Sequence, residues 1–334
     1  MTNNYKDIQK KVFSSEFTRF CQKNIVRSLK DLEKKRKAYI NCIIGVIALG
    51  IIAIFAYFYF IYANQIPFQI EAIAISIAFI VLVSNIIIKS YKSEAKKFVL
   101  PKLISYIGNF KIVDKNNVKD EIEQYVQSLN LIDSFNRFYC DDCLEGEYKG
   151  VNLNVYELDL KYTTGSGKHR RTYCIFDGLF IKFKSFKKFS GRTVIKRDEG
   201  LSMKKHGNVV LEDPEFEKYF NVDGTDQIEA RYLLTPAFMN RLVELKKRPI
   251  GRGITMSFEH GYVNIAVDSR KEWFTVPFLK EVCILQGWYK KKDWFEISIS
   301  KPVTDITNYR EIVLDLLSIF SIIDVLKMDQ NIGI

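Results

Sequence analysis

The sequence predicts an α+β protein, in which an N-terminal transmembrane helical hairpin precedes a cytoplasmic domain with a largely antiparallel sheet and packed helices. Two long runs without a charged residue predict the hairpin: 33 residues from Ala38 to Ile70 and, after Glu71, a further 17 from Ala72 to Ile88. Beyond Asn109, apolar residues recur at every second position, which is typical of strands. Helix start signals interrupt that pattern, so helices are expected to pack on the sheet.

Composition limits the class of protein. The chain of 334 residues is 47% hydrophobic and 27% charged, which excludes a disordered, collagen-like or disulfide-stapled protein. Its mean hydropathy of -0.07 suggests a soluble protein, but this value averages the apolar runs with a polar remainder. The 6 cysteines follow no regular framework, and the polar start predicts no cleavable signal peptide. We therefore expect a reducing compartment.

The apolar runs are long enough to cross a membrane. A helix from Tyr39 to Tyr62 reaches about 36 Å, against a hydrocarbon core of about 30 Å, and the stretch from Phe68 to Ile88 is just long enough. Pro67 lies between them and predicts a tight break. The alternative is a buried helix pair of a soluble protein, but core helices seldom run past about 18 residues without a charge. Glu71 is expected at the headgroup interface rather than in an ion pathway.

Basic residues flank the hairpin, and the loop that connects its two helices has none. The positive-inside rule therefore places both termini in the cytoplasm and predicts a multi-pass protein of the bacterial inner membrane. The basic residues are Lys30, Lys34, Lys35, Arg36 and Lys37 before the hairpin, and Lys89, Lys92, Lys96 and Lys97 after it.

We expect four parts along the chain: an amphipathic N-terminal helix (1–37), the transmembrane hairpin (38–90), a juxtamembrane helix (91–108) and the cytoplasmic domain (109–334). Apolar residues at mostly three- and four-residue spacing predict the first and third of these helices. Both helices either form a stalk, lie against the membrane or dock on the cytoplasmic domain, and the sequence leaves these alternatives open. Pro101 is expected to kink or restart the juxtamembrane helix.

The cytoplasmic domain combines strands and helices. Between Val155 and Leu158 the apolar phase of one predicted strand slips by one residue, which indicates a bulge. The element order also suits a pleckstrin-homology-like barrel, an alternative that rests on analogy. The predicted strands are 137–149 and 151–162 around Gly150, then 171–183, then a hairpin over 253–267 that turns at His260-Gly261. The predicted helices are 118–129, then 214–220 after the cap Asp213, then 237–247 after the cap Thr235, and 308–328.

Positive charge concentrates in one segment. Between Lys161 and Lys205 there are 13 Lys and Arg against 3 Asp and Glu, while the whole chain has a net charge of +11. Anionic lipids of the inner leaflet attract basic residues by about 1 kcal/mol each, so this segment predicts a surface for anionic lipid or a protein partner. A solvated basic face without a ligand is an equally good interpretation, and nucleic acid is disfavoured because no binding module is recognisable. The candidate binding residues are Lys182, Lys184, Lys187, Lys188, Arg192, Lys196 and Arg197.

The sequence contains no recognisable catalytic motif. Cys140 and Cys143 have the spacing of half a zinc site, but no second pair with metal-ligand spacing follows. These cysteines are therefore weak metal candidates, and two incidental thiols are the favoured interpretation. We assign no catalytic residue and no cofactor.

Several segments of the cytoplasmic domain resemble the bacterial domain-of-unknown-function 3137 family. The resemblance extends from about Ile104 to Leu285 and includes the membrane hairpin that many such proteins carry. Because the family is uncharacterised, it implies membrane association and no catalytic residues. The basic stretch from Lys182 to Lys205 departs from the family pattern, so lipid contact there is expected to be particular to this protein. The segments that carry the resemblance are Gly178–Ile181, Phe189–Val194, Leu211–Phe220 and Asp226–Met239.

The last of these motifs contains three charged residues, Asp226, Glu229 and Arg231, ahead of a capped helix. A local charge network that positions this cap is the favoured interpretation. If they face a cleft instead, they are the candidate cleft residues. The leading hypothesis is a membrane-anchored cytoplasmic binding module for a protein partner or anionic lipid headgroups. The alternative is a membrane-tethered enzyme with an unrecognised active site.

Overall fold

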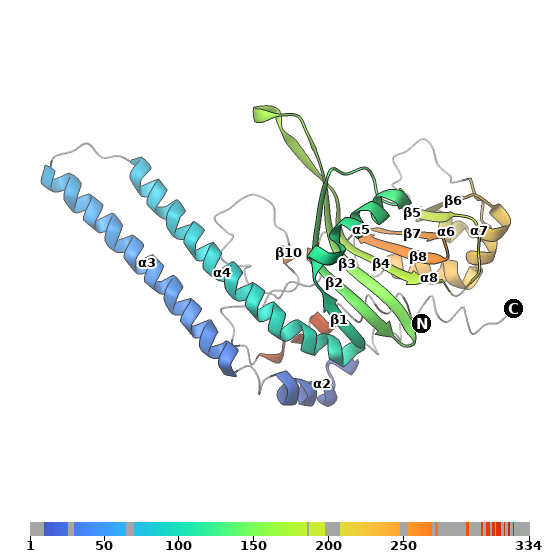
Figure 1. The fold of residues 1–334 in the computed structure, drawn as a ribbon, viewed down its shortest axis with the longest axis horizontal. Coiled ribbons are helices and arrows are strands. Elements are labelled where there is room, and N and C mark those ends of the chain that lie inside the picture. The colour runs from blue at the N-terminus through green and yellow to red at the C-terminus, as the bar shows by residue number, and fades with distance from the viewer. Residues whose placement is uncertain are drawn as a thin grey trace.

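A computed structural model gives the fold of the chain, which is α+β as predicted. It describes residues 10–25, 30–64, 70–185, 187–197, 208–247, 253–268, 271–272 and 292–293, and scattered residues between 302 and 323. Two long helices extend from one side of a sheet domain (Figure 1). The predicted break at Pro67 and much of the predicted helix 308–328 lie outside the described residues.

The two long helices form an antiparallel pair. They are α3 (Lys30–Asn64) and α4 (Ile70–Ile107), and each joins a predicted span to its charged flank in one continuous helix. Pro101 lies inside α4, which continues past it, so the predicted restart does not occur. Lys35 forms an ion pair with Glu94. The rings of Tyr39 and Tyr91 lie 5.5 Å apart, so the helix pair is joined by side-chain contacts at its charged end.

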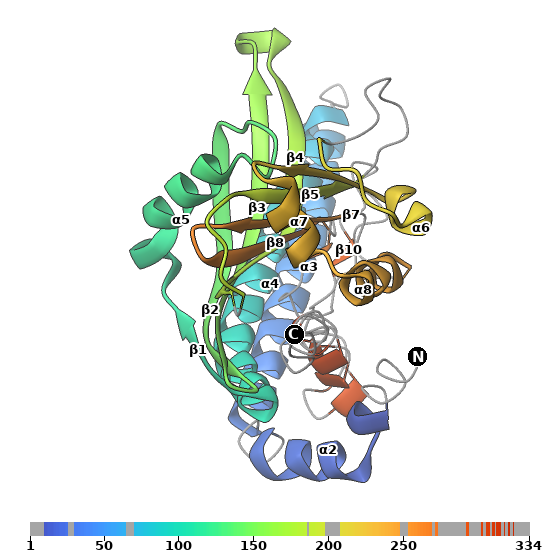
Figure 2. The ribbon, with the colours of Figure 1, turned by 90° about the vertical axis from the view of Figure 1, so that its right-hand side faces the viewer.

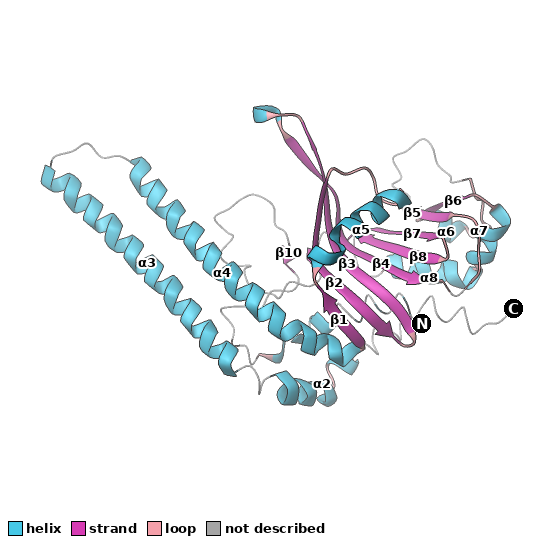
Figure 3. Cartoon of the chain, viewed as in Figure 1, coloured by secondary structure: helices cyan, strands magenta, loops and turns pink. Residues whose placement is uncertain are grey.

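The domain is built on an open sheet of eight strands in the order β1-β2-β3-β4-β8-β7-β5-β6 (Figure 3). All of its pairings are antiparallel, and β1 and β6 are its edges, so the described strands form an open sheet and not the barrel of the alternative. Both predicted hairpins are confirmed. The strands are β1 (Asn109–Val113), β2 (Arg137–Tyr148), β3 (Val151–Thr164), β4 (Arg171–Lys184), β5 (Thr193–Arg197), β6 (Phe220–Gly224), β7 (Gly253–Glu259) and β8 (Tyr262–Asp268), with a short parallel pair β9 (Lys271–Glu272) and β10 (Lys292–Asp293).

Helices cover the two faces of the sheet unequally (Figure 2). One face, here called the α5 face, packs against α5 (Lys115–Leu129). The opposite, helix-packed face belongs to a larger core that includes α4 and described residues between 306 and 323. The same core contains α2 (Ser15–Phe20), α6 (Pro214–Glu217), α7 (Gln227–Leu233) and α8 (Pro236–Lys246). The caps Asp213 and Thr235 are confirmed, but α6 ends at Glu217 because Phe220 begins β6.

The juxtamembrane end of α4 docks on the domain. Tyr91, Ala95, Val99 and Leu103 follow one another every four residues and are fully buried in the helix-packed core. Phe17 of α2 is buried in the same core. Of the alternatives left open by the sequence, docking is therefore the one that occurs, and α4 runs across the expected boundary at residue 90.

The apolar phase slip in β3 is a change of buried face and not a bulge in that strand. Val151, Leu153 and Val155 pack on the helix-packed face, whereas Tyr156 and the alternate residues after it pack on the α5 face. The bulge lies in the neighbouring strand β2, between Cys140 and Cys143, where the register shifts. Regular alternation then places Glu157 on the helix-packed face, although it carries a charged side chain.

Candidate functional site

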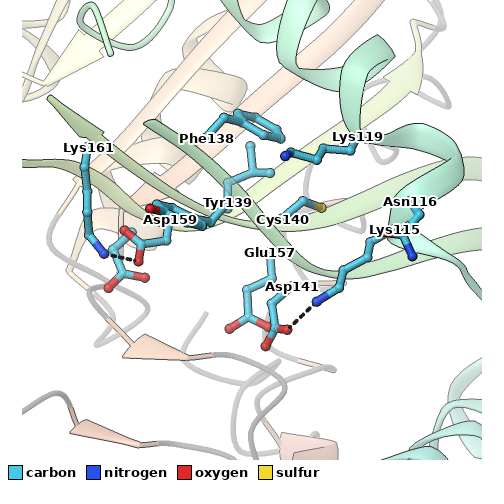
Figure 4. A pocket seen from close by; sticks show the side chains of 12 residues that line it. Lys115, Asn116, Lys119, Phe138, Tyr139, Cys140, Asp141, Glu157, Asp159 and Lys161 are labelled. Carbon is cyan, nitrogen blue, oxygen red and sulfur yellow. Dashed lines mark hydrogen bonds and ion pairs between the residues drawn. The ribbon is translucent and has the colours of Figure 1, made fainter. Parts of the chain in front are cut away.

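A cavity of about 430 Å³ opens beside the bulge of β2 (Figure 4). It forms here because β1 pairs only with residues 143–147 of β2, which leaves the first half of β2 at the edge of the sheet. The start of α5 lies over this edge. The cavity is lined by Lys115, Asn116, Lys119, Phe138, Tyr139, Cys140, Asp141, Glu157, Leu158, Asp159, Lys161 and Asp177.

Three carboxyl groups meet at the bulge: Asp141, Asp142 and Glu157, whose oxygens lie within 4.8 Å of one another. We call these three residues, together with Lys96 of α4, the acidic cluster. The Lys96 ammonium lies 3.4 Å from Asp141 and forms a closer ion pair with Asp142. Lys115 of α5 lies 3.4 Å from the other oxygen of Asp141. The cluster therefore joins the juxtamembrane helix to the sheet.

Burial sets the protonation of the acidic cluster. Burial raises the pKa of Glu157 well above its ordinary value, and the neighbouring Asp142 raises it further. The pKa of Asp142 is also raised by burial, against the attraction of Lys96. At Asp141 burial is outweighed by the charges of Lys96 and Lys115, so the pKa of this carboxyl is lowered. The cluster thus places Glu157, whose pKa is raised, close to Asp141, whose pKa is lowered.

A second group, made of Asp159, Cys174 and Asp177, lies on the same face of the sheet. The ligand atoms of these residues also lie within 4.8 Å of one another. Lys161 forms an ion pair with Asp159 at 2.7 Å. Both groups have the geometry to hold a cation, but in the acidic cluster the Lys96 ammonium already supplies the positive charge. Two carboxyls in one cavity whose pKa values are shifted in opposite directions are also the elements of general acid–base chemistry.

The sequence did not single out this cavity. Its signal was the phase slip in β3, which places Glu157 and Asp159 at positions where a continued apolar pattern would hold core residues. The sequence could not connect either residue with Lys96, because Lys96 and these strand residues are far apart in the chain and meet only in the folded protein.

Several of the seven predicted basic residues have partners within the protein. The ammonium of Lys182 lies over the rings of Tyr125 and Tyr262, at 3.7 and 4.7 Å. Lys187 donates to the backbone carbonyl of Tyr232 at 2.9 Å. Arg192 contacts the Glu259 carboxylate at 3.3 Å and donates to the carbonyl of Leu129. Lys184, Lys188, Lys196 and Arg197 are exposed.

The predicted cleft residues bind backbone groups and do not line the cavity. Asp226 caps α7 by accepting from the backbone N–H groups of residues 228 and 229. Glu229 accepts from the backbone N–H groups of Ser190 and Gly191, each at 2.8 Å. Arg231 donates to the carbonyl of residue 210 at 3.3 Å. The structure therefore supports a local stabilising role for them, although the partners are more distant in sequence than expected.

The two weak metal candidates, Cys140 and Cys143, lie on the α5 face. Their sulfur atoms are 3.1 Å apart and both residues are buried free thiols. The hydrogen bond between Cys140 and Cys143, together with burial, raises the pKa of the Cys140 thiol, which disfavours the thiolate that a metal or a redox reaction needs. Among the described residues, both groups with metal-binding geometry consist of other residues.

Fold and site together define a sheet domain that is continuous with two helices long and apolar enough to cross a membrane. Residues 174–328 match the family model described as Protein of unknown function (DUF3137), and the chain therefore carries a DUF3137 domain. The match begins in β4 and extends beyond the expected limit at residue 285, whereas most residues that line the cavity precede it. No curated protein and no solved structure matches the chain.

Proposed function

We propose that the protein is a membrane-anchored binding module, with α3 and α4 in the bacterial inner membrane and the sheet domain in the cytoplasm. The observation that carries this proposal is the exposure of the apolar helices. Both are long and apolar enough to cross a membrane, yet only 0% and 6% of their most apolar windows are buried. A core helix pair of a soluble protein would be mostly buried, and water would be a poor solvent for so large an apolar surface.

The charges at the ends of the helices support the orientation. Lys35 and Lys37 precede the apolar part of α3, and Lys89 follows that of α4, so the positive-inside rule favours a cytoplasmic domain. Alkaline carbonate extraction of native membranes tests the anchor. The full chain is expected to stay in the membrane pellet and to be released only by detergent. Release by carbonate alone would contradict membrane insertion.

The exposed lysines of the basic segment are the proposed binding surface. Lys184 ends β4 on the side of the domain away from α3 and α4 (Figure 1), and Lys188 and Lys196 belong to the same segment. Because this end of β4 is remote from the spans, these lysines suit an acidic protein surface better than lipid headgroups.

A cross-linking experiment tests this surface. A photo-reactive amino acid replaces Lys188 in the full chain, and cross-links are compared in native membranes with and without the substitutions Lys184→Glu and Lys196→Glu. We expect discrete cross-linked species that the charge reversals remove. Species that persist unchanged after both reversals would contradict recognition by charge.

One observation favours a second candidate, a membrane-tethered enzyme. The cavity contains Glu157, a carboxyl whose pKa is raised, beside Asp141, whose pKa is lowered, and such a pair can donate and accept a proton. The test incubates the full chain in detergent with a cell metabolite extract and follows depletion by mass spectrometry. An enzyme predicts depletion of specific metabolites that Glu157→Gln abolishes, and identical profiles for both proteins would contradict it.

A further inference from the structure

The β3–β4 hairpin extends beyond its neighbours in the sheet. We call residues 162–173 the hairpin tip. Pairing with β2 ends at Lys161, and pairing with β8 begins only at Gly178, so in the tip β3 and β4 pair only with each other among the described strands. Figures 1 and 2 show the tip standing clear of the rest of the domain. Ten consecutive residues, 164–173, are exposed.

Two contacts with α4 define the direction in which the tip points. Gly108, which follows α4, lies against the backbone of Glu147 in β2, where an added Cβ would stand 2.9 Å from the carbonyl oxygen. Nearer the spans, Lys96 of α4 pairs with Asp142. Moving along β2 from 147 to 142 therefore follows α4 toward the membrane. Since β3 is antiparallel to β2, its far end, Thr164, points the same way.

The hairpin is long enough to reach the membrane surface. From Lys96 to Lys89, the first charge after the apolar part of α4, seven helical residues rise about 10 Å. From Glu157, which lies opposite the bulge, to Thr164, seven strand residues extend about 23 Å. The strands run at an angle to α4, but half of this reach already brings the tip level with Lys89.

The chemistry of the tip matches an anionic membrane surface. It contains Lys168, Arg170 and Arg171, with His169 between them, and no acidic residue. The described structure gives these three cations no ion pair. Tyr162 and Tyr173 face each other across the hairpin and are 42% and 49% exposed. Tyrosine rings next to basic side chains are typical of the membrane interface.

We propose that the hairpin tip binds anionic lipid headgroups of the leaflet that the helices enter. This inference rests on the proposed membrane anchor. It gives the domain a second point of attachment, so that α4 and the tip together hold the domain in one orientation. Lys184, at the other end of β4, lies about 43 Å along the strand from Arg171 and is left facing away from the membrane.

Hydrogen exchange of the full chain in lipid nanodiscs tests the proposal. The discs contain phosphatidylcholine alone or mixed with phosphatidylglycerol. We expect exchange of the amides in residues 165–171 to be on the order of tenfold slower in the anionic discs, and this protection to disappear at high salt. The substitutions Lys168→Gln, Arg170→Gln and Arg171→Gln together should remove the lipid dependence. The matched control, Lys184→Gln with Lys188→Gln and Lys196→Gln, should retain it.

Three outcomes would overturn the inference. Equal exchange of the tip in both kinds of disc, while α3 and α4 are protected, would exclude the lipid contact and leave the anchor intact. Protection by inorganic phosphate in phosphatidylcholine discs would identify a soluble anion as the ligand. Unprotected α3 and α4 would refute the anchor and, with it, this contact.

Discussion

The carboxylate of Glu229 accepts hydrogen bonds from the backbone N–H groups of Ser190 and Gly191, both at 2.8 Å. These residues belong to two sequence motifs that resemble the DUF3137 family. Thr225 strengthens the connection, because its side-chain oxygen accepts from the Arg192 N–H at 2.8 Å. The loop before β5 is thus held on the first turn of α7, and the two motifs form one structural unit.

Glu229→Ala is expected to destabilise the protein by about 1–3 kcal/mol, because the two N–H donors lose their acceptor in a partly buried loop. The midpoint of thermal unfolding in detergent should fall accordingly. Glu212→Ala, at an exposed position, serves as the control and should leave the midpoint unchanged. A Glu229→Ala protein as stable as the wild type would show that the two hydrogen bonds to Glu229 contribute nothing to stability.

Gly191→Ala tests the same unit from the opposite side. An added Cβ would stand 2.5 Å from the Thr225 hydroxyl oxygen and 2.7 Å from a Glu229 carboxylate oxygen, so both must move. We expect a loss of about 1–3 kcal/mol. The matched control is Gly45→Ala in α3, where, apart from the neighbouring residues and backbone of the helix itself, no atom lies within 4 Å of the added Cβ. Equal unfolding midpoints for the two variants would contradict the predicted close packing.

Local signals in the sequence predicted much of the fold. The hairpin turns at Gly150 and Gly261 have positive φ values of 81° and 76°, which glycine adopts readily, and were placed correctly. The caps Asp213 and Thr235 act within three residues and were also found. The phase slip of β3 was misinterpreted because a bulge and a change of buried face look alike in a single strand.

The acidic cluster illustrates what a single sequence withholds. Lys96 was assigned to the orientation of the membrane hairpin, and this assignment did not show that its side chain would enter the domain. Its pairing with Asp142 depends on how α4 docks on the sheet, and that depends on the whole core. Conversely, it is chiefly this burial that raises the pKa of Glu157.

Lys96→Met should destabilise the protein by about 3–5 kcal/mol, because the buried Asp142 loses the ammonium group that pairs with it. Thermal unfolding measures the loss. Adding Asp142→Asn and Glu157→Gln to Lys96→Met should recover much of it, since the triple variant buries no net charge at these positions. Lys97→Met, at the adjacent exposed position, is the control. Equal destabilisation by Lys97→Met would refute the special role of Lys96.

The raised pKa of Glu157 predicts a pH dependence of stability. Above the ordinary value of 4.5 the folded protein holds a proton that the unfolded chain releases, so stability falls as the pH rises from 4.5 toward the folded pKa. Glu157→Gln lacks this proton equilibrium. The unfolding midpoint of Glu157→Gln minus that of the wild type should therefore increase as the pH rises from about 4.5 to 8. A difference that stays constant or shrinks over this range would show that Glu157 ionises normally.

In the proposed topology, α3 and α4 cross the membrane and leave the sheet domain in the cytoplasm. The most direct measurement uses two reporters on the full chain: a fluorescent protein that matures only in the cytoplasm, fused after Ile334, and a phosphatase that folds only in the periplasm, inserted between Asn64 and Ile70. Insertion in this orientation predicts a bright fluorescent fusion and an active phosphatase insertion. A dark fusion or an inactive phosphatase, with each protein present in full amount, would contradict it.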